Sequence, residues 1–113
     1  MNDFKEASMD NFKIIYKILR TLEKNMGNEK FDIASISAKK LNVPFEKWEQ
    51  LLILMQEDGY IKGLVLSNDL SSMYRHITEP IKPQITIKGL EYIAENSLME
   101  KAKEALKMAG EIF

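Results

Sequence analysis

Apolar residues recur every three or four positions through much of this chain, and that spacing is typical of amphipathic helices. The first regular stretch begins at Asp10, after a more polar segment, residues 1–9, that we expect to be a flexible extension. Asp10 or Asn11 can cap the first turn of this helix, because short polar side chains accept hydrogen bonds from free backbone N–H groups there.

Two further helices follow in quick succession. The segment "IASISAKKLNV" predicts a short helix with Ser35 or Ser37 as its cap and Asn42 as its exit residue, since Asn tolerates positive φ. Pro44 then opens a third helix, where its missing N–H costs nothing. The tight "LNVP" junction between them is typical of a helix-turn-helix.

The run "LLILMQEDGYIKGLVL" ends one pattern and starts another. Gly59 is expected to end the third helix, and the β-branched, aromatic and aliphatic residues after it favour a strand. Residues 73–78 are expected to return as the second strand of a hairpin. Pro80 and Pro83 are expected to stop the sheet from continuing simply.

The remaining chain is expected to be helical. Thr86 is the expected cap of a fourth helix, and a last helix is expected from about Leu98 to Ile112. This order predicts an α+β winged helix: a three-helix core with a helix-turn-helix, a β-hairpin wing and additional C-terminal helices. The expected divisions are residues 1–9, a winged-helix domain over 10–97, and a C-terminal amphipathic helix over 98–113.

Composition narrows the class of protein. A chain of 113 residues suits one domain, and a net charge of −1 gives no overall field that would attract nucleic acid or an anionic membrane. There is no cysteine, no apolar run long enough for a membrane span and no signal-peptide pattern. We therefore expect a cytoplasmic protein without membrane association.

Two segments resemble a known family. "ISAKKLNVPFEKWEQLLILMQEDGYIKG" followed by "ITIKGLEYIAENSLMEKA" is similar to the YjcQ family, and the likeness runs from about Met9 to Lys107. The resemblance implies a small winged-helix protein of Gram-positive bacteria and their prophages. It implies no established activity and no catalytic or ligand residues.

The charge pattern argues against a strong DNA-binding third helix. Between residues 31 and 60, three lysines stand against five acids, a local charge of −2, and carboxylates near phosphates weaken binding. The predicted solvent face carries Glu46, Glu49 and Glu57 beside its polar and basic residues. The hairpin region is better suited to DNA binding than the third helix, because residues 61–90 carry four basic residues against two acids, a charge of +2. The candidate DNA contacts are Lys39, Lys40, Lys47, Gln50, Lys62, Arg75 and His76.

Catalytic and metal-binding patterns are absent from the sequence. His76 is the only histidine, so no ligand cluster is predicted. Asp69, Ser71, Ser72 and His76 are near one another in sequence, but a short hairpin has no nucleophile elbow. No glycine-rich phosphate loop is present. We expect no enzyme activity, no metal and no cofactor.

The last predicted helix carries the second hypothesis. Small and large apolar residues repeat at alternating spacings of four and three, as in a coiled-coil seam. This helix can pack on its own domain or on a second copy of the chain. The candidate dimer residues are Leu98, Ala102, Ala105, Ala109 and Ile112.

Two functions therefore follow from the sequence. One is a DNA-associated or regulatory winged-helix protein, with double-stranded DNA as its partner. The other is a protein-interaction or homodimerisation module that has the fold but does not bind DNA.

Overall fold

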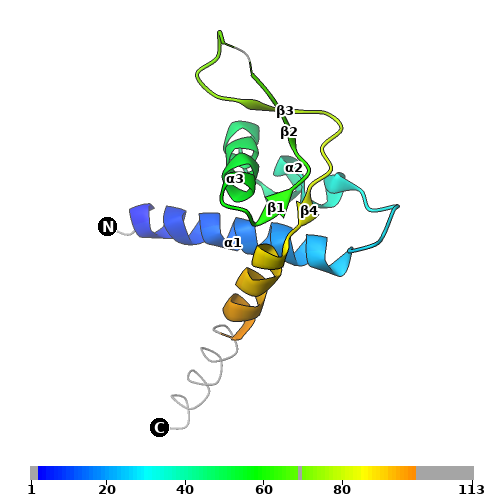
Figure 1. Cartoon of the computed structure of the whole chain (residues 1–113). Coiled ribbons are helices and arrows are strands. Elements are labelled where there is room, and N and C mark those ends of the chain that lie inside the picture. Colours follow the sequence, from blue (N-terminus) through cyan, green and yellow to red (C-terminus); the bar gives the residue numbers. More distant parts are fainter. Residues whose placement is uncertain (1–2, 69, 99–113) are drawn as a thin grey trace.

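The computed structural model of this chain describes residues 3–68 and 70–98 (Figure 1). The first half is helical, with α1 (Asp3–Lys24), a 3-10 turn η1 (Ile33–Ile36), α2 (Ala38–Leu41) and α3 (Phe45–Glu57). Four short strands follow, β1 (Ile61–Lys62), β2 (Val65–Ser67), β3 (His76–Thr78) and β4 (Gln84–Ile85), and residues 87–98 are helical. The fold is therefore α+β.

Helix α1 begins seven residues before the predicted start. Its first residue is Asp3, so Asp10 and Asn11 lie inside the helix and do not cap it. The prediction was wrong because the apolar repeat marks only where a helix is amphipathic. Residues 3–9 contain neither proline nor glycine, so nothing in their sequence stops the helix from extending.

The region of α2 and the start of α3 follows the predicted capping closely. The Ser37 hydroxyl accepts a hydrogen bond from the Lys40 N–H, and Asn42 leaves α2 in the left-handed conformation with φ 58°. Pro44 stands at the N-cap position of α3. The predicted second helix is, however, divided into η1 and α2, with Asp32 capping η1 through the Ala34 N–H.

The sharp change of geometry at Gly59 is confirmed. Gly59 has φ 86°, which only glycine adopts without strain, and β1 begins two residues later. The predicted single strand is nevertheless interrupted after Lys62, so β1 and β2 have different partners. Strand β2 pairs with β3 as the predicted hairpin, with Leu66 opposite Ile77.

Pro80 and Pro83 lie between β3 and β4, and the β2–β3 sheet does not continue through them, as expected; one more strand nevertheless follows in the other sheet. Strand β4 follows Pro83 directly and pairs antiparallel with β1, placing Ile61 opposite Ile85. Proline is tolerated here because it precedes the strand and need not donate a ladder hydrogen bond. Two small sheets result, β1–β4 beside α1 and β2–β3 beside α3, with the tip of the hairpin projecting away from the helices (Figure 1).

The core lies where α1, α3 and both sheets meet. The Trp48 indole N–H donates to the Ile36 carbonyl at 2.9 Å and so ties α3 to η1 inside this core. Thr86 caps the helix of residues 87–98 through the Gly89 N–H, as predicted. The fully buried core side chains are Ile18, Leu19, Ile36, Leu52 and Ile61.

The C-terminal helical segment differs from the expected pair of helices. Leu98 belongs to the same helix that starts at residue 87, with no interruption at Ser97. The rest of the predicted last helix lies outside the described residues. None of the helices that the structure describes combines the length and apolar character needed to cross a bilayer.

Candidate nucleic-acid interface

Glu49 is buried and fixes the hairpin β2–β3 to α3. Its carboxylate contacts His76 Nδ1 at 2.8 Å through Oε1 and accepts the Ile77 backbone N–H at 2.9 Å through Oε2. The residue is only 4% exposed. The prediction of a solvent-facing Glu49 was therefore wrong. Leu52 and Ile53 follow at the spacing of one helical face, so that Glu49 shares the side of α3 that packs on the strands.

Gln50 and Arg75, two of the predicted DNA contacts, lie together. The Gln50 side-chain amide donates to the Arg75 carbonyl oxygen at 3.1 Å. The Arg75 guanidinium itself lies 2.6 Å from a Glu57 carboxylate oxygen. Its positive charge is thus already paired across the half-exposed boundary between hairpin and helix, and it is less available to a phosphate than the sequence suggests.

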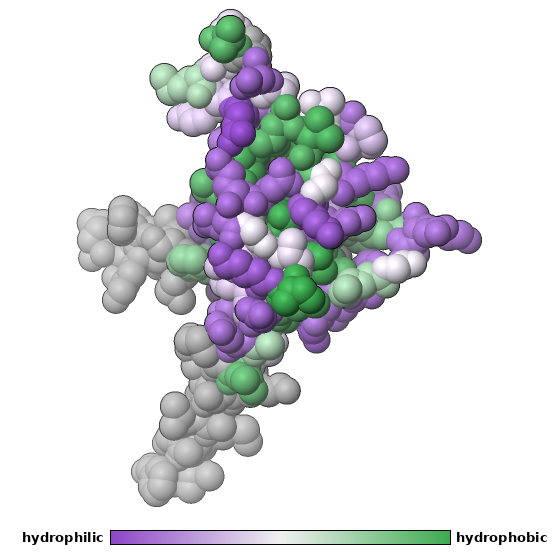
Figure 2. All heavy atoms as spheres, viewed as in Figure 1, coloured by the Kyte–Doolittle hydropathy of each residue, from purple (hydrophilic) through white to green (hydrophobic). Residues whose placement is uncertain are grey.

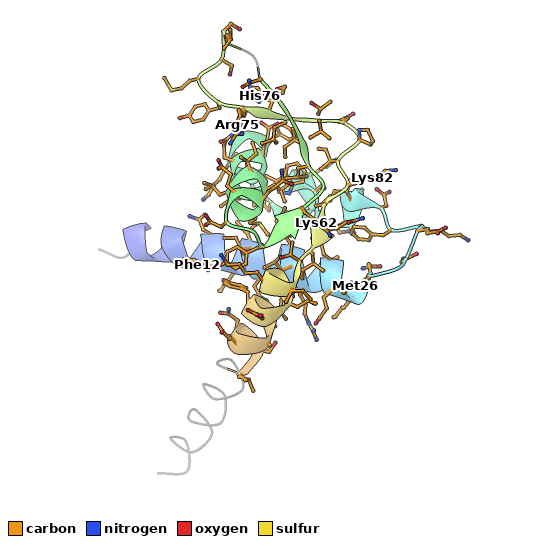
Figure 3. All side chains as sticks on the ribbon, viewed as in Figure 1. Phe12, Met26, Lys62, Arg75, His76 and Lys82 are labelled. Atoms are coloured by element: carbon orange, nitrogen blue, oxygen red, sulfur yellow. The ribbon has the colours of Figure 1, made fainter. Side chains whose placement is uncertain are left out.

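Lys62 is not part of this group. It lies on β1 and lines a cavity of about 560 Å³ together with Lys82, between the end of α1 and the β1–β4 sheet. Figure 3 shows Lys62 and Lys82 on this side of the molecule, apart from Arg75 and His76. The basic residues predicted for the hairpin region therefore do not converge on one surface.

The lysines of α2 and α3 are exposed cations. Lys39, Lys40 and Lys47 are exposed, and none makes an ion pair within the part of the chain that the structure describes. Lys47 also lines a cavity with Lys13 and Lys17 of α1. Several lysines therefore gather at this end of α3.

A contact chain joins Ser72, His76 and Glu49. The Ser72 hydroxyl lies 3.2 Å from His76 Nε2, and Glu49 contacts the opposite ring nitrogen. The same hydroxyl donates to the Tyr74 carbonyl at 2.8 Å, so its proton is not directed to the imidazole. Neither of the two cavities described above is lined by any of these three side chains. The order of groups resembles a Ser-His-acid triad, although Glu49 was not predicted as its acid.

Leu98 is the only candidate dimer residue within the part of the chain that the structure describes. Leu98 is 67% exposed, and Ala102, Ala105, Ala109 and Ile112 lie outside the described residues. Within the described part of the chain, no three His, Cys, Asp or Glu side chains gather as a metal site would require.

The sequence interpretation missed Glu49 as a fixing residue and Lys13 and Lys17 as surface cations. A signal existed for the two lysines, because they are four apart on α1, which places them on one helix face. Their closeness to Lys47 could not be predicted, because it depends on how α1 crosses α3.

Comparison with known proteins gives a family. The family model described as "YjcQ protein" matches residues 16–112. A relative from Bacillus subtilis (strain 168), named "Uncharacterized protein YjcQ", is 26% identical over 99 residues, which is 88% of this chain and 93% of that protein. No solved structure matches the chain. The resemblance of two sequence segments predicted this family. Because the family model covers most of the sequence, the chain belongs to the YjcQ family.

Proposed function

We propose that this is a non-enzymatic winged-helix protein that binds duplex DNA. The observation that carries the proposal is the attachment of the hairpin to α3 through Glu49 and Gln50. Because of this attachment, the hairpin and α3, the helix that follows the turn at Asn42, form one continuous surface. In winged-helix proteins such a helix enters the major groove while the hairpin, the wing, lies along the backbone.

Contacts within the fold reduce the effect of two acids on this surface, because Glu57 is paired with Arg75 and Glu49 is buried. Two of the five acids between residues 31 and 60, Glu49 and Glu57, are held by His76 and Arg75. The unpaired lysines of α2 and α3 then supply the phosphate contacts on which nonspecific affinity depends. Gln50 uses one N–H of its side-chain amide to hold the wing at Arg75, and its second N–H and its amide oxygen are suited to reading a base edge.

Binding rather than catalysis also accounts for the Ser72–His76–Glu49 contacts. Glu49 is occupied by the Ile77 N–H as well as by His76, which suits a clamp on the wing. A hydrolase would need a substrate cavity and oxyanion donors beside the serine. We therefore expect Ser72→Ala to leave the affinity for duplex DNA unchanged and Glu49→Ala to lower it.

Fluorescence anisotropy with a labelled random duplex tests the proposal. Binding is expected at about 50 mM salt and should weaken steeply towards about 200 mM, because bound lysines release counterions. The double variant Lys39→Gln/Lys40→Gln should reduce the steepness of the salt dependence by about two, one for each lysine. Failure of the wild-type protein to bind any duplex at the lower salt concentration would rule the function out.

A second candidate function is a protein-interaction module, and the hairpin tip favours it. Leu70 and Met73 are 97% and 89% exposed, and Tyr74 beside them is 58% exposed. Figure 2 shows apolar side chains gathered at this tip, away from the core. Isolated exposed apolar residues are ordinary, but such a group on a projecting hairpin is a typical contact surface.

Light scattering distinguishes the two homodimers that this second candidate function allows. A homodimer through the tip should become a monomer in Leu70→Ser/Met73→Ser, whereas a homodimer through the C-terminal helix should become a monomer when the chain is truncated before Leu98. A wild-type chain that is monomeric at all concentrations would exclude both homodimers.

A further inference from the structure

We propose that the cavity between α1 and the start of α3 is a phosphate-binding pocket, and that in the complex it holds a backbone phosphate of duplex DNA. The inference rests on the proposed DNA binding and extends it to α1, which the sequence did not implicate. The pocket, called here the lysine pocket, has a volume of about 260 Å³. Its cationic lining residues are Lys13, Lys17 and Lys47.

The charged residues that line the lysine pocket are all lysines. Lys13 and Lys17 come from one face of α1, and Lys47 comes from the first turns of α3. No acid is among the residues that line the cavity, and the three lysines form no ion pair within the described residues. Three like charges around one small cavity repel one another, and an anion that enters it relieves this repulsion.

The polar and apolar lining fits a phosphate group rather than a flat organic ligand. Asn42 lines the pocket, and its side-chain amide makes no hydrogen bond with any described residue, so it can donate to a phosphate oxygen. Ile14 and Val43 form an apolar wall that limits competing water. The volume is below the ~300–1,000 Å³ usual for pockets that bind whole drug-sized ligands, which suits a single phosphate.

The first turn of α3 adds to the attraction. Pro44 lines the same cavity at the N-cap position, and it has no side-chain acceptor to cap the free N–H groups of the helix. These N–H groups carry partial positive charge, which favours a nearby anion. Glu46 belongs to this turn but does not line the pocket.

The position of the pocket gives its role in the DNA complex. It lies at the junction of α2 and α3, where a helix that enters the major groove passes the sugar–phosphate backbone. A phosphate held there would set how deeply α3 enters the groove. Because phosphate contacts position a protein without reading sequence, the lysine pocket should affect all duplexes alike.

The test compares two double variants with the same change in charge. Lys13→Gln/Lys17→Gln removes two lysines of the pocket, and Lys24→Gln/Lys30→Gln removes two exposed lysines outside it. With a labelled random duplex, the pocket variant should lower the slope of log affinity against log salt by about two, and the control variant should leave it nearly unchanged. Circular dichroism checks that both variants remain folded.

The outcomes separate this inference from the proposed function. If the wild-type protein binds duplex DNA and both variants change the slope equally, the lysine pocket is not a phosphate site, whereas the proposed DNA binding is retained. If the wild-type protein binds no duplex DNA, amide NMR spectra recorded with and without inorganic phosphate test whether the pocket binds phosphate. Shifts at Asn42 and Lys47 that the pocket variant abolishes would retain the phosphate pocket, whose phosphate would then come from a smaller ligand, and no shifts would overturn it.

Discussion

Gln56 holds both backbone polar groups of Leu64. Its side-chain amide nitrogen donates to the Leu64 carbonyl at 3.1 Å, and its amide oxygen accepts the Leu64 N–H at 2.8 Å. Leu64 is buried in the gap between β1 and β2, where no strand partner is available. The side chain therefore replaces a strand at this point and allows the chain to change from one sheet to the other.

Replacing Gln56 with methionine should destabilise the fold by about 1–3 kcal/mol, because the Leu64 groups lose their partners while the side-chain size is nearly kept. Chemical denaturation followed by the emission of Trp48, which is buried, measures the change. Gln84→Met, at an exposed glutamine without a side-chain hydrogen bond to the described residues, is the matched control. Equal stability of the two variants would contradict the bridging role of Gln56.

Glu49→Ala should release the hairpin from α3 and cost about 1–3 kcal/mol, since it leaves the Ile77 N–H without an acceptor in a buried position. Hydrogen exchange at Ile77 should accelerate more than exchange at Leu52 in α3, because the hairpin opens before the helix. Glu46→Ala, on the exposed face of the same helix, should change stability by less than about 0.5 kcal/mol. Unchanged protection at Ile77 would show that Glu49 does not fix the hairpin.

Local features of the fold were predictable because they depend on single residues. Ser37, Asn42 and Gly59 each have a backbone role that their chemistry favours, and the structure confirms all three. The pairing of β2 with β3 was predictable for the same reason, since a hairpin joins neighbours in sequence.

The pairing of β1 with β4 was not predictable, because it joins segments about 20 residues apart through a proline-containing loop. The candidate site likewise has features that were predictable from the sequence and features that were not. Lys39, Lys40 and Lys47 are exposed as predicted, but the pairing of Arg75 with Glu57 depends on how the hairpin lies on α3. Sequence periodicity contains no information on that arrangement.

Gly89→Ala should destabilise the protein by about 1–3 kcal/mol or more through overpacking. A methyl group at this position would overlap the Tyr60 carbonyl oxygen and lie 2.7 Å from Ile85 Cγ1, so that the C-terminal helix could not approach β4 as closely. Gly27→Ala is the control for added volume, because a methyl group there would meet no atom within 4 Å, although the φ of 80° adds a backbone cost of about 1 kcal/mol. Thermal denaturation should rank Gly89→Ala below Gly27→Ala, and the reverse order would contradict the close approach.

Tyr92 should make stability depend on alkaline pH. Burial, and then the neighbouring Tyr60, raise the pKa of Tyr92 above its ordinary value of 10.0, so the folded protein retains the phenolic proton more tightly than the unfolded chain does. This contribution is fully present below the unfolded pKa and is lost as pH rises through the folded pKa. Urea denaturation at a series of pH values should therefore show stability falling above about pH 10. In Tyr92→Phe the fall should be shallower while stability at pH 7 changes little, and an identical fall in both proteins would refute the assignment to Tyr92.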